Sequence, residues 1–199
     1  MNRRGWENED IDDSDGGKNI DPDVSLLETW EGMQAMVDKG LTKHIGLSNV
    51  PIALLHELLA SKPRIRPYLN QVELHPYLPQ DHLVQYCHSR QVAVQAYSPL
   101  GASPDYKESG EPALLQDPVL LKIAARHSKT VAQVCIQWAL QRNTSVIVKT
   151  TSTAHQRENL DLDFVLTGED LKEISSLAKR NHRYFRPEDW WGSIGAVFA

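Results

Sequence analysis

Hydrophobic positions along the chain fall into helical stripes separated by short apolar runs. Leu26, Trp30, Met33 and Val37 recur at helical spacing and predict one helix with a single buried face. Further helices are predicted by a proline or capping residue ahead of an apolar stripe: after Pro51, near 80–90, from Asp117-Pro118 through Ala125, after Thr130 and after Thr167. Capping boxes are expected at Ser25/Glu28 and Thr130/Gln133, and Gly40 is expected to end the first helix in a left-handed conformation.

The short apolar runs between these helices predict four strands, at His44–Ser48, Tyr68–Leu74, Val92–Tyr97 and Ser145–Lys149. Strands that alternate with helices and are apolar throughout indicate a parallel sheet. The predicted fold class is therefore α/β, a parallel β/α barrel of the TIM type. A full barrel typically takes about 250 residues. The chain has 199 residues, so an incomplete barrel of about four β/α units is expected.

Polar residues follow three neighbouring strands at the point where each strand ends, as Ser48-Asn49, Asn70-Gln71 and Tyr97-Ser98. Parallel strands bring these ends to one rim of the sheet, which is where barrels carry their function. Hydroxyl and carboxamide groups there can pair with a planar amide ligand, and the Tyr97 ring can stack on it. The alternative, in which they only satisfy the backbone of the loops, stays open.

Composition and the motifs that are missing from the sequence argue against several classes of protein. The net charge is −5, and no basic face for nucleic acid is evident. No glycine-rich dinucleotide or P-loop motif is found, and no apolar run predicts secretion or membrane insertion. The two cysteines, Cys87 and Cys135, fall in helical patterns and are expected to be buried thiols, which suits a reducing cytoplasmic location.

The first 24 residues are polar and lack periodicity, so a loop or a disordered segment is expected over 1–24. An alternative is a calcium loop over 12–23, with ligands from Asp12, Ser14 and Asp23. Gly16 at a ligand position and Pro22 within the loop argue against it.

Four segments, "GLSN", "NQVELHPY", "AYSPLG" and "VKTTSTAHQREN", occur in an order and spacing that resemble the aldo-keto reductase family. The resemblance covers residues 20–184 and corresponds to the last four barrel strands of that family. It implies that residues 25–180 form the C-terminal half of the barrel and that 181–199 form an aromatic tail. Trp190 and Trp191 in that tail either line a pocket or pack against the barrel.

The resemblance also implies a site for NADP(H). Ser48, Asn49 and Gln71 are expected to hold the nicotinamide carboxamide, and Tyr97 to stack on its ring. The remaining positions follow from the last two segments: Ser98 and Leu100 at the pyrophosphate, Lys149 and Thr150 at the 2′-phosphate with His155 near it, and Glu158 and Asn159 at the adenine. Ser152, in the same segment, is expected to contact the cofactor as well. The family commonly has arginine where this chain has His155, so a two-pronged phosphate contact is lost. Arg157 lies close in sequence, either as a substitute or as a solvated surface charge.

The family's proton-transfer residues are Tyr, Lys, His and Asp, and by resemblance they belong to strands that have no counterpart here. The chain is therefore expected to hold the cofactor half of a reductase for aldehydes or ketones, to be inactive alone, and to self-associate through open sheet edges. The competing interpretation is a non-catalytic fragment that binds a nucleotide or an assembly partner.

A third interpretation is an unrelated β/α barrel hydrolase. It would need carboxylates at strand ends, and Glu73 is the obvious one. Glu73 is more simply read as a structural residue that lines the barrel, and His75 as a structural residue beside it.

Overall fold

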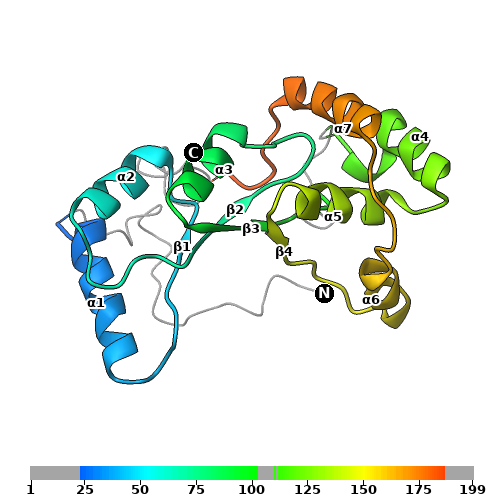
Figure 1. Cartoon of the computed structure of the whole chain (residues 1–199). Coiled ribbons are helices and arrows are strands. Elements are labelled where there is room, and N and C mark those ends of the chain that lie inside the picture. The colour runs from blue at the N-terminus through cyan, green and yellow to red at the C-terminus, as the bar shows by residue number, and fades with distance from the viewer. Residues whose placement is uncertain (1–22, 103–109, 111, 187–199) are drawn as a thin grey trace.

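A computed structural model describes residues 23–102, 110 and 112–186, and it contains one parallel sheet. The strands lie in the order β1 (Leu47–Ser48), β2 (Leu69–Glu73), β3 (Ala93–Tyr97) and β4 (Ser145–Val146). Figure 1 shows the helices arranged around this sheet: α1 (Leu26–Asp38), α2 (Ile52–Ala60), α3 (Asp81–Ser89), η2 (Leu114–Gln116), α4 (Pro118–His127), α5 (Val131–Gln141), α6 (Thr153–Leu160), α7 (Gly168–Ser175) and η3 (Ser176–Arg180). The predicted β/α order is confirmed, and within the described residues the sheet does not close into a barrel.

Most predicted helix ends are confirmed by their capping contacts. Ser25 Oγ accepts a hydrogen bond from the Glu28 amide at 3.1 Å, which is one half of the capping box expected there, and Asp117 caps α4 through the Val119 amide at 2.8 Å. Thr130 and Gln133 form both halves of a capping box on α5. Gly40 follows α1 with φ +69, a left-handed conformation that glycine adopts without steric cost.

Two expectations about local structure are wrong in detail, and one helix was not predicted. The strands predicted over 44–48 and 145–149 shrink to two residues each, because each is an edge strand that pairs on one side only in the described part of the chain. In α1, Met33 is 36% exposed whereas Gln34 is buried and accepts the Ile65 amide at 2.8 Å. Helix α6 was not expected, since none of its residues is buried and its sequence carries no apolar stripe.

The two faces of the sheet differ in character. Paired residues of parallel strands point to the same side, so the pairings place Ser48, Gln71, Gln95 and Ser145 in one polar row across all four strands. We call this side the open face; its row is exposed or half-buried. The opposite side is buried and mostly apolar, with Leu47, Asn70, Val72, Val94 and Ala96.

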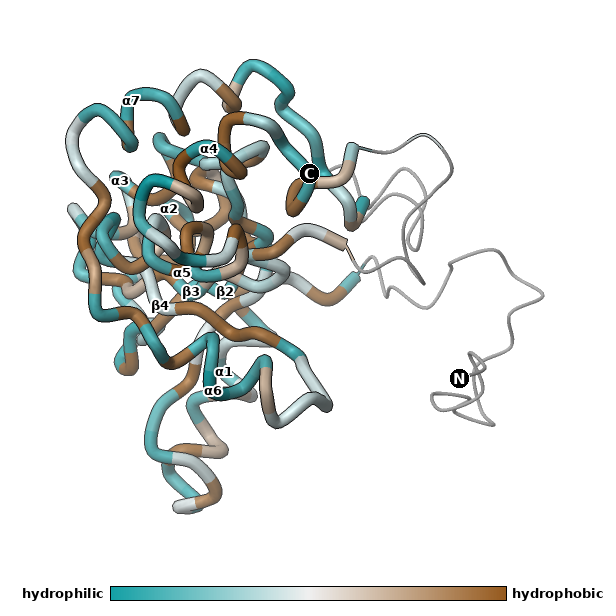
Figure 2. The backbone as a smooth tube through the Cα atoms, turned by 90° about the vertical axis from the view of Figure 1, so that its right-hand side faces the viewer, coloured by the Kyte–Doolittle hydropathy of each residue, from teal (hydrophilic) through white to brown (hydrophobic). Residues whose placement is uncertain are grey.

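The core lies between this buried side and the helices. Both cysteines are buried and free, as predicted. Figure 2 shows hydrophobic stretches in the middle of the molecule around α5 and hydrophilic ones along the outer turns of α7. No helix in the described ranges is long and apolar enough to cross a membrane. The possible calcium loop, apart from Asp23, and both tail tryptophans lie outside the described residues.

Candidate functional site

Four of the residues singled out from the sequence meet at the carboxyl end of the sheet. Ser48 and Gln71 are register partners on the open face, and the Asn49 amide donates to the Gln71 carbonyl at 2.8 Å. Tyr97 ends β3 next to Glu73 in the register. We call Ser48, Asn49, Gln71 and Tyr97 the strand-end cluster.

Hydrogen-bonding capacity remains open in this cluster. The Asn49 side-chain oxygen is buried and has no hydrogen-bond partner among the described residues. A buried carbonyl oxygen without a donor costs free energy, so a bound N–H group would be stabilised there. Gln71 Nε2 donates to Gln95 Oε1 at 2.7 Å, which fixes the Gln71 amide above the sheet. These groups fit a planar carboxamide such as that of a nicotinamide.

Tyr97 offers an aromatic surface beside these amides. Its ring meets Phe185 edge-on, with centroids 5.9 Å apart and planes at 70°. Burial and the nearby Glu73 charge raise the pKa of Tyr97 to about 12, although Arg183 opposes the shift. The phenol therefore stays protonated at neutral pH.

The chain leads away from the cluster at the last residue of β3; we call residues 97–101 the linker. Ser98 has φ +49 and Gly101 φ +77, and the Gly101 amide closes a turn on the Ser98 carbonyl at 2.9 Å. Asn49, directly after β1, is also left-handed with φ +56. Such positions are sparsely populated by residues other than glycine and recur at functional sites.

The linker ends at a concave site, which we call the α6 cleft. It has a volume of about 330 Å³ and brings together six residues predicted from the sequence: Leu100, Lys149, Thr150, His155, Glu158 and Asn159. Sequence reasoning missed Leu115 and Thr130, which also line it. Thr130 was seen only as a helix cap, yet its hydroxyl donates to Glu158 Oε1 at 2.6 Å.

The N-terminus of α6 forms one wall of this cleft. Ser152 caps the helix by accepting the His155 amide at 3.4 Å, and its own amide donates to Thr150 Oγ1 at 3.1 Å. Lys149 and His155 are exposed, and both line the cleft together with the half-buried Thr150, so an ammonium and a hydroxyl group border the same opening. Arg157 is exposed on α6 and does not line the cleft.

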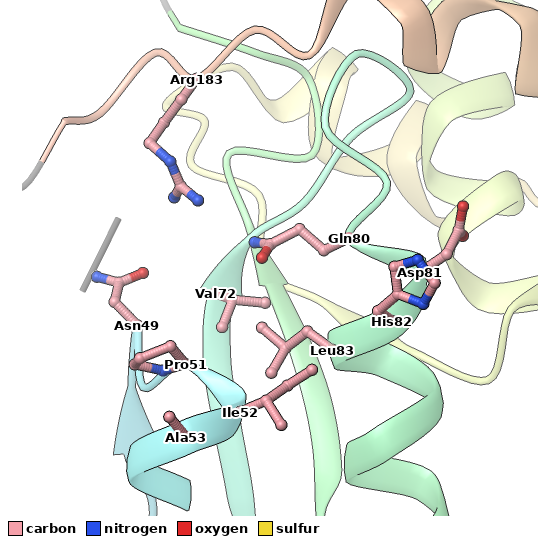
Figure 3. A pocket seen from close by; sticks show the side chains of 10 residues that line it. All are labelled: Asn49, Pro51, Ile52, Ala53, Val72, Gln80, Asp81, His82, Leu83 and Arg183. Carbon is pink, nitrogen blue, oxygen red and sulfur yellow. The ribbon is translucent and has the colours of Figure 1, made fainter. Parts of the chain in front are cut away.

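Another pocket, of about 440 Å³, lies between the start of α2 and the start of α3. Apolar side chains of Ile52, Val72 and Leu83 line part of it, whereas Asn49 lies at one side and Arg183 lies above them (Figure 3). Within the described residues no group of three or more His, Cys, Asp or Glu side chains is arranged for a metal ion.

Two polar residues, Asn70 within β2 and His75 just after it, serve the fold. The Asn70 side chain bridges the Val50 amide and carbonyl at 3.3 and 2.8 Å. His75 is fully buried and donates through Nε2 to Glu73 at 2.9 Å. The structural interpretations of His75 and Glu73 are consistent with these contacts.

Comparison with known proteins identifies the family. The model of the aldo/keto reductase family matches residues 18–179. The NADP-dependent D-sorbitol-6-phosphate dehydrogenase of Malus domestica is 41% identical over 175 residues, covering 87% of this chain and 56% of that protein. Aldo-keto reductase family 1 member C15 of Rattus norvegicus is 43% identical over 173 residues, covering 84% and 53%.

Prostaglandin F synthase 2 of Bos taurus is 40% identical over 183 residues, covering 89% of this chain and 56% of that protein. The chain thus spans about half the length of the curated relatives it matches. Because the family match extends over most of the sequence, this chain belongs to the aldo/keto reductase family.

Proposed function

We propose that this chain holds the NADP(H) cofactor of a reductase that converts aldehydes or ketones to alcohols. When bound, the cofactor supplies hydride to the carbonyl carbon. The observation that carries the proposal is the continuity of the site: the strand-end cluster, the linker and the α6 cleft follow one another through Tyr97–Leu100. A dinucleotide has the same order of parts, a planar carboxamide, a pyrophosphate and an adenosine.

The strand-end cluster would hold the nicotinamide. Asn49 Oδ1 would accept from the carboxamide NH₂, Ser48 and Gln71 would complete its hydrogen bonds, and the Tyr97 ring would pack on the ring face. Because Gln71 is already held by Gln95, the amides are oriented before the ligand arrives. Ser98 and Leu100 would follow the pyrophosphate along the linker.

The α6 cleft would hold the adenosine end. Lys149 and Thr150 would bind the 2′-phosphate beside Ser152 at the helix N-terminus, where backbone amides favour an anion. Glu158 and Asn159 would contact the adenine. His155 replaces a common arginine, so the preference for NADP(H) over NAD(H) would rest mainly on Lys149.

Proton transfer to the developing alkoxide would need an acid that the described residues do not present at the cluster. Tyr97, the nearest phenol, is a poor acid with its pKa raised to about 12. We therefore propose that the 199-residue chain alone binds cofactor without reducing carbonyls, and that residues outside it supply the acid. A cytoplasmic location is proposed on the two reduced, buried thiols.

Fluorescence titration of the 199-residue chain tests the cofactor site, since the chain has five tryptophans. NADPH should quench the emission at lower concentration than NADH. Lys149→Met should erase that difference, whereas Lys179→Met, an exposed lysine away from the cleft, should preserve it. Equal affinity for both dinucleotides, unchanged in Lys149→Met, would refute the assignment.

An assay with a generic aldehyde separates the reductase from its alternative. The chain alone should give no turnover, and adding the N-terminal half of a close relative should restore it. A chain that binds NADPH but stays inactive in that complex would support the non-catalytic nucleotide binder or assembly partner instead. Turnover by the chain alone, surviving a contamination control, would refute its proposed inactivity.

A further inference from the structure

The carboxylate of Glu73 joins the end of β2 to a segment more than a hundred residues later in the sequence. Its side chain is fully buried. Oε1 accepts the Tyr184 amide at 2.8 Å, and Oε2 accepts the Phe185 amide at 3.1 Å. His75 Nε2 donates to Oε1 at 2.9 Å, and the Arg183 guanidinium lies 4.0 Å from Oε2. One carboxylate therefore holds two consecutive backbone amides.

The two residues held in this way contact opposite ends of the linker; we call them the aromatic clamp. Phe185 packs edge-on against Tyr97 at the start of the linker. Tyr184 packs at its end, so closely that a Cβ on Gly101 would lie 3.0 Å from the Tyr184 ring. Tyr184 Oη also donates to the Pro112 carbonyl at 2.8 Å.

The chemistry of the bonds makes the anchor specific for a carboxylate. Both oxygens of a carboxylate accept, and here each has a backbone N–H. A glutamine of the same shape would turn its NH₂ group toward one of those N–H groups, which sets donor against donor. Buried hydrogen bonds to a charged acceptor are among the strong ones, so their loss should free the clamp.

We infer that Glu73 is a positioning residue for cofactor binding: through the aromatic clamp it holds the linker against the strand-end cluster. The inference rests on the proposed function, because it assigns the linker to the nicotinamide and pyrophosphate part of NADP(H). It implies that Glu73 acts chiefly on that part of the ligand. The adenosine end should be little affected, because the α6 cleft is lined mostly by residues outside the linker.

Two probes separate these ends: NADPH, and 2′,5′-ADP, which has the adenosine and its 2′-phosphate but no nicotinamide. In the full 199-residue chain, Glu73→Gln should weaken NADPH binding by about tenfold or more. Binding of 2′,5′-ADP, measured by calorimetry, should stay within about twofold of the unchanged chain. Glu57→Gln, at an exposed position on α2, should change neither affinity.

A second variant avoids altering the buried carboxylate. Phe185→Ala keeps the backbone amide that Glu73 accepts and removes the ring that meets Tyr97 edge-on. It should give the same selective loss at a smaller size, about two- to tenfold for NADPH. Hydrogen exchange gives a readout that needs no ligand: the Tyr184 and Phe185 amides should exchange slowly in the unchanged chain and at least about tenfold faster in Glu73→Gln.

Equal losses for both probes, or no loss for NADPH in either variant, would overturn the inference while leaving the cofactor site standing. Faster exchange without any change in NADPH affinity would overturn it as well. If the unchanged chain binds neither probe, the proposed function fails, and this inference fails with it.

Discussion

Tyr77 and Asp117 form a buried hydrogen bond of 2.7 Å between the phenol oxygen and Oδ2 of the carboxylate. Asp117 also caps α4 through Oδ1, and the Arg180 guanidinium lies over the Tyr77 ring, 4.8 Å from its centre. The pair thus fastens the loop after β2 to the start of α4 and to η3. Burial and the Asp117 contact raise the pKa of Tyr77 well above its ordinary range, so the phenol remains a donor.

Tyr77→Phe should lower the free energy of unfolding by about 1–3 kcal/mol, because it removes one hydrogen bond to a charged acceptor. Urea unfolding followed by circular dichroism would measure the change. Tyr86→Phe is the matched control, since its phenol bonds His56 at the surface, 2.9 Å away. A similar loss in both variants would mean that the buried hydrogen bond contributes no more to the free energy of unfolding than the surface one.

Protonation of Asp170 should destabilise the fold over a defined range of acidic pH. Burial alone raises the pKa of Asp170, but hydrogen bonds from His127 and Thr167 outweigh it and lower the pKa from 3.8 to about 2. A depressed pKa stabilises the fold above the unfolded value, and this contribution is lost as the pH falls from about 4 to about 2. The amount is about 2 kcal/mol.

Asp170→Asn should remove this pH dependence, while Asp163→Asn, at an exposed site, should retain it. Denaturant midpoints at a series of pH values give the comparison. An Asp170→Asn curve parallel to that of the unchanged chain through this range would contradict the prediction.

His155→Arg should tighten NADPH binding if the α6 cleft holds the 2′-phosphate. A charged hydrogen bond of about 1.5–3 kcal/mol corresponds to roughly 10- to 150-fold in affinity. NADH, which lacks that phosphate, should bind as before. Gln156→Arg adds the same charge one residue along α6 and should have little effect; an equal gain in this control would indicate general electrostatic attraction instead.

The chain should self-associate as its concentration rises. Strands β1 and β4 each pair on one side only within the described residues, so their outer backbone groups can accept another strand. Ser145→Lys places a charge on the exposed end of β4 and should reduce association in light scattering, whereas Ser176→Lys in η3 should not. A monomer at every concentration, with protected amides in 68–74, would contradict this expectation.

Local signals in the sequence predicted the helices better than the strands. The caps at Thr130 and Asp117 are set by residues two or three positions apart, so spacing alone identifies them. The extents of β1 and β4 depend on neighbouring strands, which spacing does not report. Gln34 was missed in the core because its burial follows from a bond to Ile65, more than thirty residues away.

In the candidate site, too, residues in continuous segments were predicted, whereas contacts between distant residues were not. The resemblance identified six of the residues that line the α6 cleft, since they lie in two continuous segments of the sequence. It did not identify Leu115 and Thr130, which come from other segments. The anchoring role of Glu73 was not predicted, because its partners Tyr184 and Phe185 are distant in sequence and use only their backbone amides. No side-chain pattern marks a bond of that kind.

The left-handed backbone at Asn49 and Ser98 lowers the thermal stability of the fold, but it also positions two residues of the proposed cofactor site. Glycine would adopt φ +56 or +49 without a Cβ clash, although it would also raise the conformational entropy of the unfolded chain. Asparagine tolerates this conformation better than serine, so relief should be larger at Ser98. Ser98→Gly should melt at the same or a higher temperature and yet bind dinucleotide more weakly. Selection of this chain for thermal stability alone would therefore favour glycine at these strand ends, and cofactor binding would be weakened there first.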